Sequence, residues 1–182
     1  HVQEPTEPGP SGDIQTAGGA ATSGPDSARL SEVVAQLKGG TNKQREAAAV
    51  VLRFLGSLSM RAEAEAREVL AESLLADKCC HVRRNAAIGL GALPHSASVA
   101  PLVAALGTDL DWATRVESAK ALSVVGAEES ARPPLTALLS VMCDDASEEV
   151  RVAAVGAALA LGASGPAASE ARAVARRGLK DS

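Results

Sequence analysis

Small and apolar residues recur at helical spacing along most of the chain, between short breaks rich in glycine, proline and polar residues. The clearest example is residues 77–93, where Val82, Ala86 and Leu90 would lie on one face of a helix that Pro94 would stop. An acidic turn precedes this stretch. The pattern predicts an α-helix with one buried face.

The pattern of residues 77–93 is found four times in one register, which is set by four arginines. Apolar residues stand seven and ten positions after each arginine, and a glycine or proline follows at the eleventh. An aspartate stands six positions before three of the four. A repeat of roughly 35 residues is typical of helical solenoids. The arginines are Arg45, Arg83, Arg115 and Arg151, and the aspartates are Asp77, Asp109 and Asp145.

The repeat predicts an all-α superhelix of about four helical hairpins over residues 27–180, closed by a C-terminal helix at about 166–179. Pro101 would lie inside the first helix of the third unit and should kink it. The paired helices are expected at 27–38 and 42–55, 61–76 and 77–93, 96–106 and 112–125, and 130–142 and 147–161.

Composition separates the first residues from the rest. Residues 1–26 are rich in proline, glycine, serine and threonine and are expected to be a disordered acidic tail. Residues 1–28 contain four carboxylates and no Lys or Arg, so they account for the whole net charge of −4. The remainder is neutral, which argues against nucleic-acid or membrane partners.

Other features of the composition bear on the setting of the protein. Aromatic residues make up only 1% of the chain, and the apolar fraction is largely Ala, Leu and Val, which favours helix over strand. Three cysteines do not form a disulfide framework, so we expect an intracellular protein, cytoplasmic rather than nuclear. The chain begins with His rather than Met, and we expect it to be a segment of a larger protein.

Residues 82–91, Val-Arg-Arg-Asn-Ala-Ala-Ile-Gly-Leu-Gly, resemble the second helix of a HEAT repeat, a member of the armadillo-like helical group. The same motif begins at residues 150–151, and residues 115–122 and 45–52 match it less closely. The resemblance implies antiparallel helix pairs stacked into a superhelix, with a ladder formed by the turn aspartate and the arginine six residues later. This implied ladder is Asp77/Arg83, Asp109/Arg115 and Asp145/Arg151.

The first unit departs from this resemblance. It has Gly39 and Gly40 in place of the turn aspartate. Two explanations are open: the unit is the N-terminal end of the array, with no preceding partner, or its turn is remodelled. We favour the first.

The sequence offers little chemistry for catalysis. Cys79, Cys80 and His81 are consecutive, so on a helix they would point about 100° apart and could not converge on one metal ion. We interpret the two cysteines as turn or packing residues, with a reactive thiol near a helix N-terminus as the alternative. Cys143 matches Leu75 in register and is expected to be buried.

Known enzymes of this architecture also fail to match. No histidine is followed by glutamate, so the iron-binding His-Glu pairs of deoxyhypusine hydroxylase are missing. DNA-alkylation repair enzymes need a basic, aromatic-bearing face, and nothing marks the bilin site of a lyase. We predict no catalytic residue, cofactor or metal, while a HEAT-fold lyase or other enzyme component stays open as the alternative.

The turns inside the units carry the charges and the single tryptophan. Basic residues gather at the turns of units one and two, and acidic residues at those of units three and four. Stacking would align them as a docking edge for a protein partner, although a solvated edge of helix-capping acids is the simpler alternative. We predict a non-enzymatic protein-interaction scaffold, with a tubulin- or cytoskeleton-binding module as a further alternative. The candidate binding residues are Trp112, Asp111, Lys78, His81, Arg84, Glu148 and Glu149.

Overall fold

The computed structural model describes residues 25–54, 60–126 and 132–163, and within these ranges the chain folds into helices without a strand. The helices are α1 (Pro25–Gly39), α2 (Asn42–Leu52), α3 (Met60–Ala76), α4 (Cys80–Ala92), the short 3-10 helix η1 (Ser96–Ser98), α5 (Val99–Thr108), α6 (Trp112–Val125), α7 (Arg132–Asp144) and α8 (Glu148–Ala163).

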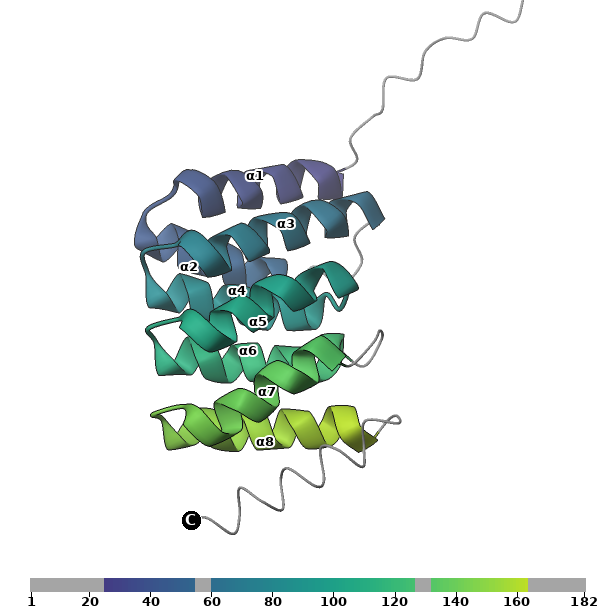
Figure 1. Ribbon diagram of the computed structural model, residues 1–182. Coiled ribbons are helices and arrows are strands. Elements are labelled where there is room, and N and C mark those ends of the chain that lie inside the picture. The colour runs from purple at the N-terminus through teal and green to yellow at the C-terminus, as the bar shows by residue number, and fades with distance from the viewer. Residues whose placement is uncertain (1–24, 55–59, 127–131, 164–182) are drawn as a thin grey trace, which may run out of the picture.

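The helices form four antiparallel hairpins stacked in two layers (Figure 1). The first helices, α1, α3, α5 and α7, pack on one another in one layer, and the second helices, α2, α4, α6 and α8, do so in the other. Each unit thus contacts only its neighbours, as in a solenoid. The predicted all-α superhelix of four hairpins is confirmed, whereas the expected N-terminal tail and C-terminal helix lie outside the described residues.

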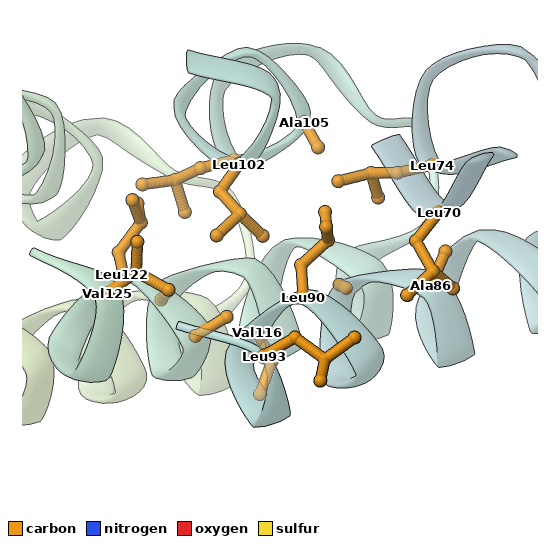
Figure 2. Packing of buried hydrophobic residues seen from close by; sticks show 14 of the residues in the cluster. Leu70, Leu74, Ala86, Leu90, Leu93, Leu102, Ala105, Val116, Leu122 and Val125 are labelled. Atoms are coloured by element: carbon orange, nitrogen blue, oxygen red, sulfur yellow. The ribbon is translucent and has the colours of Figure 1, made fainter. Parts of the chain in front are cut away.

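The core runs between the two layers as a line of leucines. Leu90 of α4 is fully buried and points toward the layer of first helices, where Leu74 of α3 and Leu102 of α5 point toward it (Figure 2). Leu70 of α3 points toward α4 beside Ala86 (Figure 2). The same repeat position holds Leu52 and Leu122, both also fully buried, and Ala158 at 2% exposure. One apolar column therefore joins all four units.

Two details differ from the sequence-based expectations. Pro101 does not kink a long helix, because η1 precedes α5 and the proline falls in the first turn of α5, where its missing N–H needs no partner. Cys143 is exposed, so the prediction that it is buried is wrong. Leu75, its match in register, is itself 54% exposed, so this position faces solvent.

The first turn is built differently from the others. Thr41 and Gln44 form a capping box at the start of α2, in which the Thr41 N–H donates to Gln44 Oε1 at 2.9 Å. A Cβ atom added at Gly40 would lie 2.5 Å from the carbonyl oxygen of Gln36. The turn therefore has no room for a side chain at Gly40 and is built differently from the later turns, as the second explanation, a remodelled turn, expects.

Candidate protein-binding edge

The turns that join the first and second helix of each unit lie along one edge of the stack (Figure 1). All seven candidate binding residues are in these turns or at the start of α4, α6 and α8. The arginines and aspartates of the implied ladder lie along the same edge. The geometry of this edge decides which side chains a partner could reach.

The ladder joins neighbouring units through arginine forks. Arg83 donates from Nε and Nη2 to the two carboxylate oxygens of Asp109, at 2.7 and 2.8 Å. Arg115 holds Asp145 in the same way, at 2.7 and 2.8 Å. The side chains of the Arg83–Asp109 pair are only 15% and 5% exposed, so solvent screens this pair little.

The remaining nitrogen of each fork fastens the arginine to its own turn. Nη1 of Arg83 donates to the main-chain carbonyl of Asp77 at 3.0 Å, and Nη1 of Arg115 to that of Asp109 at 2.8 Å. The implied pairs therefore meet through a carbonyl oxygen, while each carboxylate binds the arginine of the preceding unit. Arg45 supplies the first such rung, which the implied ladder did not include, by binding Asp77 at 2.7 Å.

Each ladder carboxylate also accepts a main-chain N–H two residues later, as Asp145 does from Ser147 at 2.8 Å. The hydrogen bond from Arg115 lowers the pKa of Asp145, although partial burial opposes it. Burial alone would raise the pKa of Asp77, but hydrogen bonds from Arg45 and the N–H of Cys79 outweigh it, and its pKa is also lowered. Both groups are thereby held as carboxylates.

Two of the candidate binding residues bind each other. Arg84 Nη2 lies 3.5 Å from Asp111 Oδ2, which links the second unit to the third. Asp111 also caps α6 by accepting the Thr114 N–H at 2.9 Å. Burial would raise the pKa of Asp111, but the Thr114 hydrogen bonds and the charge of Arg84 lower it. Both charges already have partners, so they are poorly placed to recognise another molecule.

The other polar candidates are exposed. Lys78 and His81 face solvent at the second turn, while Glu148 and Glu149 face solvent at the fourth. The two glutamates open α8, where the helix dipole favours negative charge. A hydrogen bond from the Ser147 hydroxyl at 2.7 Å lowers the pKa of Glu149. Opposite charges therefore stand two units apart along the edge.

Large apolar side chains occupy the middle of the edge. Trp112 is 49% exposed, Leu110 in the same turn is 97% exposed, and Leu75 of the preceding unit is 54% exposed. Leu75 and Leu110 both line a groove of about 210 Å³, whose lining also includes Arg83 and Asp109. Trp112 was among the candidates predicted from the sequence, but Leu75 in the last turn of α3 and Leu110 in the turn before α6 were not, since a single leucine carries no signal of exposure.

The described residues contain no group of three or more His, Cys, Asp or Glu side chains arranged to hold a metal ion. Cys79 is the N-cap residue of α4 and Cys80 is its first residue, and both are half-buried. His81 is exposed beside them. None of the helices in the described ranges is long and apolar enough to cross a membrane.

Comparison with known proteins places these hairpins in a family. Residues 67–155, from α3 into α8, match the family model of HEAT repeats. This part of the chain belongs to the HEAT-repeat family. HEAT repeats are commonly protein-interaction scaffolds and generally lack enzymatic activity. No curated protein matches the chain.

Proposed function

We propose that this protein is a non-catalytic HEAT-repeat scaffold that binds another protein through its turn edge. The observation that carries the proposal is the exposure of Leu75, Leu110 and Trp112 at the turn edge of two adjacent units. Side chains of this kind are enriched at the centres of interfaces, where their burial supplies much of the binding energy. They stand on turns held by the arginine ladder, so a partner would meet a preorganised surface.

The charges beside these apolar residues favour a protein partner over nucleic acid. Lys78 and His81 flank the apolar centre on one side and Glu148 and Glu149 on the other. A polyanion would be repelled at the acidic end, whereas a protein surface with complementary charges would be guided to one orientation. The three cysteines are free, which fits a reducing compartment, and we place the protein in the cytoplasm.

The test compares the wild type with variants that keep the same fold. The proteins that cross-link to each are quantified by mass spectrometry. The edge variant carries Leu75→Ser, Leu110→Ser and Trp112→Ser. The matched control is Met60→Ser, because Met60 is 88% exposed at the opposite end of α3 from the turn edge. Partners that the control retains and the edge variant loses would support the proposal.

A second variant examines the outer face of the second helices, the other surface a partner could use. It carries Val51→Ser and Val124→Ser, at positions that are 42% and 50% exposed. Partners lost only in this variant would show that the second helices, and not the turns, form the interface. An edge variant that retains every partner of the wild type would contradict the proposed function of the edge.

A further inference from the structure

The far side of α8 lacks the cover that the same side of every earlier second helix has. Four positions after the register arginine, Ala49, Ala87 and Ala119 are completely buried, whereas Val155 in α8 is only half-buried. In α4 this side meets the next unit directly, since a Cβ added at Gly91 would lie 3.1 Å from that of Ala121. The described residues place no helix beyond α8.

This uncovered side of α8 is apolar. Val152, Val155 and Leu159 follow one another at helical spacing and form a stripe, with Gly156 open beside it. Val152 is 63% exposed and Leu159 43%, while Val116, which precedes Val152 by one repeat, is only 9% exposed. A stripe of this kind is typical of a helix face that another element covers.

The ladder points to the same side. Nη1 of Arg151 donates to the carbonyl oxygen of Asp145 at 2.9 Å, as Arg83 and Arg115 do in their own turns. In those two arginines, Nε and Nη2 then hold the carboxylate of the next unit. Among the residues that the structure describes, no carboxylate forms an ion pair with Arg151. Its fork is held in place for a carboxylate from beyond α8.

The sequence after α8 supplies one at the right distance. Asp181 follows Arg151 by the same 30 residues that separate Arg115 from Asp145. We propose that residues 164–182 cover the open end of the stack in the register of a fifth first helix, where they shield the α8 stripe, and that Asp181 binds the Arg151 guanidinium as the fourth rung of the ladder. These residues lie outside the described part of the chain, so the proposal rests on the α8 stripe, the Arg151 fork and the spacing.

The length and composition of this segment fit that position. A helix over residues 166–179 would be about 21 Å long, close to the roughly 24 Å of α8. Its alanines are small enough to pack against the larger Val152 and Leu159, and its arginines would face water. An apolar inner face and a charged outer face make a terminal cap, which solenoids need to prevent association through their ends. The inference is independent of the proposed binding function of the turn edge.

The test is a double-mutant cycle in the full chain, read by hydrogen exchange of the α8 amides. Asp181→Asn is the main variant, Arg151→Gln the second, and Glu170→Gln a matched control within the same segment. We expect Asp181→Asn to speed exchange in α8 about tenfold, the effect of losing one charge-assisted fork, and Glu170→Gln to leave it unchanged. The double variant should exchange no faster than Arg151→Gln alone, since both changes remove the same contact.

Two results would overturn the proposal. One is an α8 exchange rate in Asp181→Asn equal to that of the wild type and of Glu170→Gln. The other is protection of α8 that disappears on dilution, together with a dimer in light scattering, because a second copy would then cover the stripe. Asp181→Asn keeps the size of the side chain and lies outside the four described units, so we expect these units to stay folded.

Discussion

Leu90→Ala removes the side chain at the centre of the apolar column, and its cost follows from the packing. Leu90 of α4 is completely buried, with α3 and α5 facing it (Figure 2). Three carbon atoms lose their burial at about 0.8 kcal/mol each, or roughly 2.4 kcal/mol. Neighbouring leucines held by two stacked units collapse only partly into the space, so a cavity term of about 1–2 kcal/mol adds to this. We expect a total loss of about 3–4 kcal/mol.

The matched control for this substitution is Leu75→Ala in α3. Leu75 has the same side chain but is 54% exposed, so we expect it to cost less than half as much. The assay is urea unfolding followed by far-UV circular dichroism, with the slope compared among the three proteins because an array of repeats can unfold in parts. Equal losses for the two variants, or a loss below about 1 kcal/mol for Leu90→Ala, would refute the packing argument.

Three further predictions concern acid, the tryptophan and the cysteines. Because the pKa of Asp145 is lowered in the folded state, its carboxylate stabilises the fold above the unfolded-state pKa of about 4, and this contribution is lost as the pH falls through the folded-state pKa. The difference in thermal stability between wild type and Asp145→Asn should therefore shrink in acid. A difference that stays constant with pH would contradict this. Trp112→Ala should cost less than about 1 kcal/mol in thermal unfolding because the side chain is 49% exposed, whereas a loss above about 2 kcal/mol would mean that it belongs to the packing. A thiol reagent should modify exposed Cys143 before half-buried Cys79 and Cys80, and the reverse order would show that the turn is open.

The repeat could be read from the sequence because its signal is periodic. Leu52, Leu90 and Leu122 recur in one register, and the structure buries all three completely. The starts of the second helices at residues 42 and 112 were placed correctly for the same reason, and in the structure Thr41 and Asp111 cap these two helices. Helix existence and register are local properties of the chain, so they needed no knowledge of the stack.

The contacts of the candidate site were harder to predict from the sequence, because they join residues of different units. The resemblance paired three aspartates with the arginine six residues later in the same unit, but stacking places the carboxylate of Asp109 against Arg83, 26 residues earlier. The pairing of Arg84 with Asp111 was missed for the same reason. Cys143 was misjudged because register shows which positions are equivalent but not whether they face the core.

The account depends on hairpins stacked in register and joined by arginine forks, and a double-mutant cycle across one rung tests this most directly. The variants are Arg83→Gln, Asp109→Asn and the two together, with free energies of unfolding measured in urea. The fork predicts that the losses of unfolding free energy in the two single variants sum to about 1–3 kcal/mol more than the loss in the double variant. The reason is that each single change leaves a poorly hydrated charge without its partner. Losses that simply add would mean that Arg83 and Asp109 do not meet, and the stacking described here would be wrong.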